Sequence, residues 1–286
     1  FITIIIKNKI ITLDEIMIEK IISTKELNGT FFCHFFLPEI KDFISNDKKV
    51  KYEKDLLNIN PNIFDNFDQL REIGENDSYI CSLIRNDLIE DFIVYINQNN
   101  ISLKSKIKPS IFESHPFLIE NEPELIEYAA FFGSIQIFKY LQLNKVELPK
   151  TLWLYAIHSN NAELIHILEE ERIVNINEFE YYEKLFLESI KCHHNEIAEY
   201  LQNCYSSQSL DEEEQHKKFD ENVIMSSFQY FNYKYYPDEF DDGVGFFNLY
   251  KYNYLNIVDL YLKKKEKYIE SEIILIFFFL NQISIN

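Results

Sequence analysis

The stretch Lys-Cys-His-His-Asn-Glu at 191–196 holds four side chains of types that bind metal ions, namely Cys192, His193, His194 and Glu196. A structural zinc site needs four ligands that converge as a tetrahedron, usually from two pairs on separate turns. Adjacent histidines point apart, and no second Cys or His pair with ligand spacing completes the set. The sequence therefore predicts no metal here, and it predicts that His193 lies in an exposed turn between two helices.

The other histidines of interest give no catalytic pattern. His34 follows Cys33 in the aromatic run "FFCHFF", but a Cys-His dyad also requires an orienting residue and an oxyanion hole. Core packing is therefore the prediction for this pair. His158 and His166 are expected on different helices, which favours ordinary helix positions over shared ligands. The sequence predicts no catalytic residue.

Cofactor and calcium signatures are also missing from the sequence. The acidic stretch "PDEFDDGVG" at 237–245 lacks the alternating ligands and closing Glu of a calcium loop, because Phe240 interrupts the alternation. The 5 glycines of the whole chain leave little room for a Gly-rich loop that binds phosphate. We expect a solvated loop at 237–245 and no bound cofactor.

Composition narrows the classes of partner. Hydrophobic residues make up 47% of the 286 residues, which is typical of a folded chain and not of a disordered one. The formal net charge is −19, so the surface repels nucleic-acid phosphates, and nucleic-acid binding is disfavoured. The apolar stretches at 1–6 and 273–280 are shorter than the roughly 20 residues of a membrane helix. The four cysteines have no disulfide spacing, which favours reduced thiols and a cytoplasmic location.

The elements that must carry these residues are repeated helical hairpins. Tyr-Ala-Ala-Phe-Phe-Gly-Ser at 128–134 returns 27 residues later as Tyr-Ala-Ile-His-Ser-Asn-Asn at 155–161. The helical phrase at 135–141 returns at the same step as 162–168. Each copy predicts two short amphipathic helices, of about 8–10 residues, around a polar turn.

Further copies extend the pattern in both directions. They begin near 87, 195 and 253, and the stretch 219–233 has room for a degenerate one. A unit of two short helices cannot bury its apolar face alone, so neighbouring units must stack on one another. The sequence therefore predicts an all-α helical-repeat solenoid.

This pattern resembles the ankyrin repeat, and in particular the degenerate ankyrin-like domain of unknown function found in large protist repeat families. The resemblance rests on a small-residue pair, a Gly or Asn, an apolar pair and a Leu at matching positions. A Gly or Asn between the helices suits a left-handed residue that ends the first helix, as at Gly133, Asn160 and Asn253. The matching residues are Ala129, Ala130, Gly133, Ile137, Phe138 and Leu141 in one copy, Ala156, Asn160, Leu164, Ile165 and Leu168 in the next, and Ser189, His193, Ile197, Ala198 and Leu201 in the third.

The sequence also departs from the ankyrin pattern. No copy keeps the opening Thr-Pro-Leu-His, and Trp153 stands in its Leu position. Lys145 stands where a Gly usually closes the second helix, and the 27-residue step implies a shortened linker. We expect the following residues to be buried between neighbouring repeats: Ala129, Ala130, Leu141, Ala156, Leu164, Leu168, Ile197 and Leu201.

The predicted organisation has three parts. Residues 1–75 form a helical N-terminal region of unknown role, and its last helix ends near Gly74. Residues 76–270 form four to six ankyrin-like repeats, some of them degenerate. Residues 271–286 form an apolar C-terminal tail, as a truncated end would.

The resemblance implies a non-catalytic scaffold that binds another protein, with recognition in the linkers between repeats. Two alternatives stay open: the regulatory part of an enzyme whose catalytic region lies outside the recognised repeats, and a decayed family member without a retained partner. The partner-binding residues that we expect are Asn144, Lys145, Glu147, Lys150, Arg172, Asn175 and Glu178.

Overall fold

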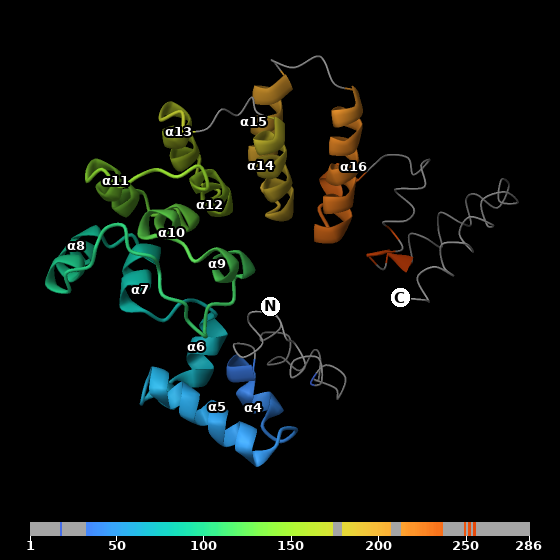
Figure 1. Cartoon of the computed structure of the whole chain (residues 1–286). Coiled ribbons are helices and arrows are strands. Elements are labelled where there is room, and N and C mark those ends of the chain that lie inside the picture. The colour runs from blue at the N-terminus through green and yellow to red at the C-terminus, as the bar shows by residue number, and fades with distance from the viewer. Residues whose placement is uncertain are drawn as a thin grey trace, which may run out of the picture. The chain divides into compact units, whose positions relative to one another are not determined.

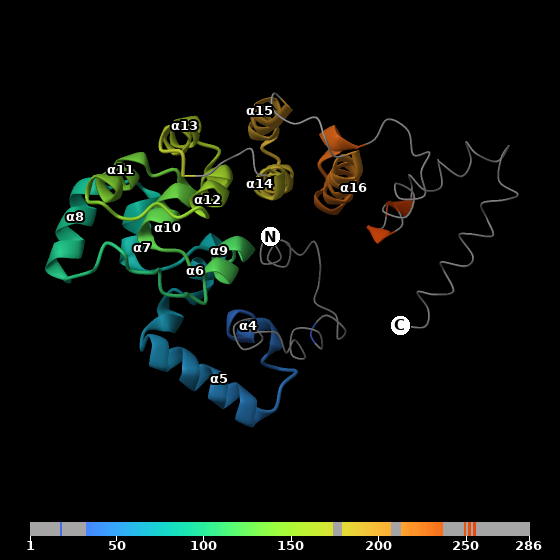
Figure 2. The ribbon, with the colours of Figure 1, turned by 45° about the horizontal axis from the view of Figure 1, so that its top comes forward.

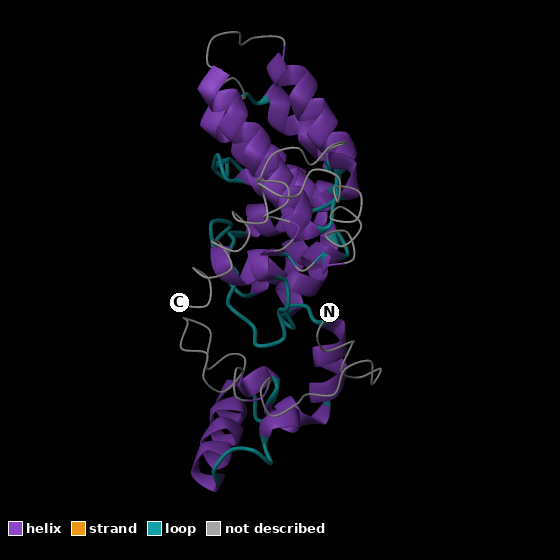
Figure 3. Cartoon of the chain, turned by 90° about the vertical axis from the view of Figure 1, so that its right-hand side faces the viewer, coloured by secondary structure: helices purple, strands orange, loops and turns teal. Residues whose placement is uncertain are grey.

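The computed structural model describes residues 18, 33–173, 179–206, 213–236, 249, 251–252 and 254–255. Within these residues every regular element is a helix (Figure 3), and the only extended pairing is an isolated antiparallel bridge between Lys106 and Glu124. The prediction of an all-α fold is therefore confirmed. None of the described helices is long and apolar enough to cross a membrane.

The chain divides into two compact units, 1–159 and 160–286, which are described separately. This boundary falls inside the segment predicted as repeats, between two helices that the 27-residue pattern places in one hairpin. The predicted organisation into 1–75, 76–270 and 271–286 stays a prediction, and its C-terminal tail lies outside the described residues.

The first unit opens with a small helical subcore. It is formed by α4 (Leu37–Ile40), α5 (Asn46–Ile59), the 3₁₀ turn η1 (Ile63–Asp65) and α6 (Phe67–Ile73). As predicted, its last helix ends at Gly74, which takes a left-handed φ of 70°. The apolar side chains that pack together here are Leu37, Leu56, Ile63, Phe67 and Phe112.

A buried arginine joins two of these helices. Arg71 is only 4% exposed, and one of its terminal nitrogens donates to both carboxylate oxygens of Glu39, at 2.6 and 2.8 Å. Its guanidinium lies 5.1 Å from the ring centre of Phe35 and 5.7 Å from that of Phe67. A buried charge requires such pairing, so Arg71 fixes α4 against α6.

The remainder of the first unit is built from helical hairpins (Figure 1). Helices α7 (Tyr79–Arg85), α10 (Leu125–Phe132) and α12 (Leu152–Ser159) lie side by side as one row. Helices α8 (Ile89–Gln98) and α11 (Ile135–Leu143) pair with α7 and α10 and lie along one side of that row (Figure 2). The short helix α9 (Pro116–Asn121) lies in the segment between α8 and α10.

Most of the α-helices described in the second unit are longer than those of the hairpins in the first unit. The second unit contains α13 (Ala162–Glu170), α14 (Phe179–Lys191), α15 (Asn195–Ser206), α16 (Glu213–Tyr230) and the 3₁₀ turn η2 (Tyr233–Tyr235), and α14 packs against both α15 and α16. The expected helix length of about 8–10 residues is wrong for α14, α15 and α16, which have 13, 12 and 18 residues. In α14 the buried positions continue at helical spacing from Tyr182 to Ile190, which sustains the extra turn.

Successive helices end in the same way. The residue between the two helices of a hairpin has a left-handed φ, at Asp87 (50°), Gly133 (67°) and His193 (61°), among others. The next amide then bonds back five residues, as from Ser134 to the Ala129 carbonyl at 2.9 Å. This is the Schellman motif. The left-handed turn predicted at Gly133 and Asn160 is confirmed, with a φ of 50° at Asn160, while Asn253 lies outside the described residues.

Polar bonds between neighbouring hairpins accompany this turn in both units. The Ser134 hydroxyl donates to the Ile84 carbonyl at 2.6 Å, and the Asn232 side chain donates to the Ile190 carbonyl at 3.0 Å. In each case the donor directly follows a left-handed residue, and the acceptor lies three residues before the left-handed residue of another hairpin. The same contact thus recurs along the chain and fixes the register of adjacent hairpins.

The predicted core is confirmed. All eight residues expected to be buried are buried, from fully enclosed alanines to Ile197 at 8% exposure. Cys33 and His34 are also buried, as the aromatic run suggested. The small side chains matter because α10 and α12 pack closely, and a larger residue at Ala129, Ala130 or Ala156 would separate them.

Candidate interaction surface

The linker between α11 and α12 is exposed, as the sequence predicts. Asn144, Lys145, Glu147 and Lys150 all face solvent, whereas Val146 is buried. Lys145 takes a left-handed φ of 60°, and the Val146 amide bonds back to the Leu141 carbonyl at 3.2 Å. The Schellman turn thus holds the loop at its base while its charged side chains project outward.

Arg172 occupies the corresponding place after α13. It is exposed, has a left-handed φ of 50°, and its amide donates to the Glu169 carbonyl at 3.1 Å. It follows Lys145 by the 27 residues that separate the two repeat copies. The other two expected residues of this linker, Asn175 and Glu178, lie outside the described residues.

These linkers suit recognition more than stability. Exposed charges on loops contribute little to folding, because water and salt screen them. Charges of this kind, where they lie at a protein interface, mainly accelerate and orient association. Of the seven expected residues, the structure brings four together in the loop after α11 and places Arg172 at the matching position after α13.

A second feature was missed by the sequence analysis. Hairpins α7–α8 and α10–α11 begin 46 residues apart instead of 27, because residues 99–124 form an insertion that contains α9. Its side chain Phe117 lies against the row of helices, with its ring centre 4.9 Å from that of Tyr155, 4.3 Å from that of His158 and 6.1 Å from that of Phe131. The available signal was the presence of Pro109, Pro116 and Pro123 in a chain with only 7 prolines.

A buried polar network fastens the insertion to the start of α7. Glu113 is 6% exposed and accepts hydrogen bonds from the backbone amides of Asn76 and His115, at 3.3 and 2.9 Å. Burial raises the pKa of Glu113. The Asn76 side chain donates to the Lys108 carbonyl at 2.8 Å, and Arg85 donates to the Asn76 carbonyl at 2.8 Å. These bonds satisfy groups that would otherwise be buried without partners.

The thiols of Cys81, which is buried, and Cys192, which is half-buried, are poor nucleophiles. Burial raises the pKa of Cys81, which lies beside this network. Burial and the nearby Glu188 carboxylate raise the pKa of Cys192 to about 12. Because the thiolate is the reactive form of cysteine, both side chains are protonated near neutral pH.

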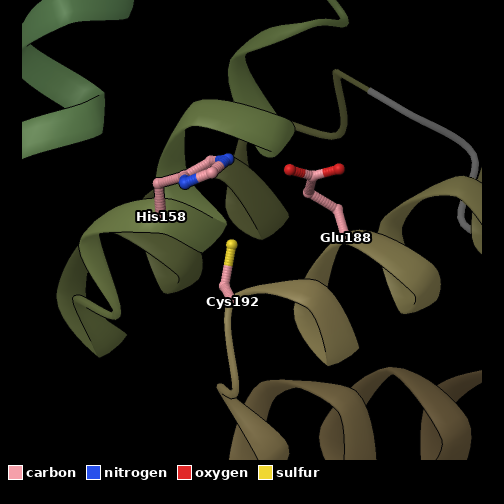
Figure 4. A group of neighbouring side chains, drawn as sticks. All are labelled: His158, Glu188 and Cys192. Carbon is pink, nitrogen blue, oxygen red and sulfur yellow. The ribbon is translucent and has the colours of Figure 1, made fainter. Parts of the chain in front are cut away.

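The four residues at 191–196 whose side chains could bind a metal lie in the turn between α14 and α15 and in the first turn of α15. Among the described residues, Cys192, His193, His194 and Glu196 do not form a group close enough to share an ion. His193 has a left-handed φ, as its predicted turn position requires, and its Nε2 lies 2.7 Å from the Tyr230 carbonyl. Figure 4 shows Glu188 on α14 and Cys192 directly after the end of this helix; the third residue that it labels, His158, belongs to α12 of the other unit.

The acidic stretch 237–245 lies outside the described residues. No family model, curated protein or solved structure matches the chain.

Proposed function

We propose that this chain is a non-catalytic scaffold that binds another protein in the cytoplasm through a stack of ankyrin-like repeats. The observation that carries the proposal is the repeated hairpin: a helix, a left-handed turn, and a second helix closed by another left-handed residue at Lys145 and Arg172. The buried small and apolar residues at matching positions support the same repeat.

The resemblance to ankyrin repeats is strongest where the step is 27 residues, from α10 to α13. There the small-residue positions hold Ala129, Ala130 and Ala156, and the turn positions hold Gly133 and Asn160. The bond from Ser134 to Ile84 supports stacking of successive hairpins in one register. The insertion before α10 and the longer helices after α13 depart from a regular repeat.

Charge and chemistry favour a protein as the partner. The net charge of −19 opposes binding to nucleic acids. The raised pKa values of Cys81 and Cys192 argue against thiol chemistry at these two residues. The linker after α11 offers charges of both signs, Lys145, Glu147 and Lys150, on a loop that its own turn holds in place. A partner recognised here carries a complementary, mixed-charge surface.

A comparative capture experiment tests the proposal. The full chain and a variant with Lys145, Lys150 and Arg172 all replaced by Glu are used as baits, and the bound proteins are identified by mass spectrometry. A control bait replaces the exposed lysines Lys48, Lys51 and Lys54 of α5 by Glu, which makes the same change in net charge. We expect a stoichiometric protein partner that the control retains and the linker variant loses. The same proteins on all three baits would reject the linkers as the recognition surface.

A further inference from the structure

Two helices of the first unit, α10 and α12, are buried along most of their length. In α10, every residue from Leu125 to Phe131 is buried, and so is every residue of α12 from Leu152 to Ile157. One side of α10 packs against α11. Phe131 of α10 and Tyr155 and His158 of α12 form a group of aromatic rings, and Phe117 of the insertion helix α9 lies on these rings.

Helix α9 lies on this face as a bound peptide would. Phe117 and Leu118, adjacent in sequence, are 8% and 5% exposed and serve as its two apolar anchors. Of the residues that follow them, Ile119 is half-buried, whereas Glu120 and Asn121 are polar and exposed. Burial of the apolar side chains of a short helix against an apolar surface is one of the usual modes of peptide recognition.

Helix α9 has little stability of its own. It has only six residues, which is too short for a helix to persist in water without tertiary contacts. It ends at Glu122, whose φ of 43° and ψ of 66° place a residue other than Gly or Asn in the left-handed region. Pro116 and Pro123 enclose the segment. The tertiary contacts of Phe117 and the burial of Leu118 therefore maintain the helix.

Both ends of the segment are fastened independently of this docking. Before α9, the backbone amide and the hydroxyl of Ser114 both donate to the Gly74 carbonyl, at 3.0 and 2.7 Å. After α9, the Ile107 amide donates to the Pro123 carbonyl at 2.7 Å, and the Leu125 amide donates to the Ser105 carbonyl at 3.1 Å. The stretch 116–122 can thus leave its site while these anchors stay in place.

We propose that the aromatic face of α10 and α12 is a second recognition surface, specific for a short amphipathic helix that presents an adjacent Phe-Leu pair, and that α9 is its tethered occupant. A partner helix of this chemistry binds by displacing α9, so the surface is open only to ligands that compete with the chain's own segment. The inference rests on the proposed scaffold function, because a second recognition surface has a role only in a chain that binds other proteins. Binding to this face and binding at the linkers are separate properties that can fail separately.

The test uses a fluorescent peptide with the sequence of residues 114–123, Ser-His-Pro-Phe-Leu-Ile-Glu-Asn-Glu-Pro. Its binding is measured by fluorescence anisotropy to the full chain and to the double variant Phe117→Ala/Leu118→Ala. We expect the variant to bind the peptide at least about tenfold more tightly than the unaltered chain, because a tethered occupant competes at a high effective concentration. A peptide with Ala in place of its Phe is expected not to bind.

A matched control separates this effect from a general loss of apolar side chains. The variant Phe64→Ala/Ile73→Ala removes two exposed apolar side chains from the same unit, 45% and 53% exposed, and is expected to bind the peptide no better than the unaltered chain. A folded Phe117→Ala/Leu118→Ala variant that binds neither peptide would overturn the proposal. So would equal binding of the two peptides, because the Phe anchor would then have no role.

A second measurement needs no substitution and applies even if the double variant does not fold. Hydrogen exchange of the unaltered chain is followed at the amides of residues 118–122 and of α10. Displacement of α9 requires local opening, so we expect the α9 amides to exchange at least about a hundredfold faster than those of α10. Exchange of both at the same rate would mean that α9 leaves only when the unit unfolds, and would overturn the proposal.

Discussion

At the scale of single residues, two buried side chains show how this chain is constrained. Ala130 is fully buried in the helix α10, where the row of inner helices packs closely. Glu113 is a carboxyl group buried among backbone donors, one of which, the Asn76 amide, is 37 residues away in the sequence. The first position was predictable from the repeat pattern. The second was not, because Glu113 meets Asn76 across 37 residues, and no local pattern encodes that contact.

Enlarging Ala130 tests the packing of the inner row. We expect Ala130→Leu to lower the free energy of unfolding by about 1–3 kcal/mol, because extra methyl groups do not fit a close-packed core. Ala162→Leu is the matched control: this alanine is exposed on α13, and its replacement is expected to change stability by less than about 0.5 kcal/mol. Urea unfolding followed by circular dichroism measures both. Equal stability of Ala130→Leu and the unaltered chain would contradict the helix register.

Titration of Glu113 tests the buried network. Its folded-state pKa is raised, so the folded chain binds this proton more tightly than the unfolded chain does. Stability from this group is therefore greatest below the ordinary Glu pKa and falls as the pH rises through the raised value. We expect the melting temperature of Glu113→Gln, relative to that of the unaltered chain, to rise as the pH is increased from 4.5, the ordinary pKa of Glu, to 7.5. If the melting temperature of the variant instead fell relative to that of the unaltered chain over this range, the folded state would favour the carboxylate form of Glu113.

At the scale of the elements, the left-handed turn that ends a helix is the feature that the sequence predicts best. Gly133 and Asn160 were expected to be left-handed from residue type and spacing alone, and both are. Lys145 takes the same conformation although lysine does not favour it, so the repeat position decides there. The insertion 99–124 could not be predicted, because it has no helical period and its one helix depends on tertiary contacts of Phe117.

Replacing the turn glycine tests this element. We expect Gly133→Ala to reduce the free energy of unfolding by about 1–2 kcal/mol, because a Cβ is strained at a φ of 67°. Asn160→Gly, at the equivalent turn with a φ of 50°, is expected not to lower stability, since Gly adopts this conformation without strain. Chemical denaturation of both variants is the measurement. If Gly133→Ala were as stable as the unaltered chain, a glycine would not be needed for the left-handed turn of this hairpin.

At the scale of the whole molecule, the sequence predicted an all-helical chain of repeated hairpins, and the described residues agree. The expected core was correct at every position because apolar spacing encodes burial directly. Recognition is less predictable, because the residues that we propose for it lie on exposed linkers, where packing does not decide the residue type. What they bind depends on surface charge, and the linker after α11 presents Lys145, Glu147 and Lys150 together.

The salt dependence of partner binding tests the central claim most directly. The affinity of the captured partner is measured by calorimetry at low and high salt for three chains: the unaltered chain, the linker variant Lys145→Glu/Lys150→Glu/Arg172→Glu, and the α5 control Lys48→Glu/Lys51→Glu/Lys54→Glu. The account predicts that the linker variant binds at least about tenfold more weakly at low salt with an unchanged melting temperature, that added salt narrows this difference, and that the control binds like the unaltered chain. Unchanged affinity of the linker variant at every salt concentration, with binding lost in the α5 control, would contradict it.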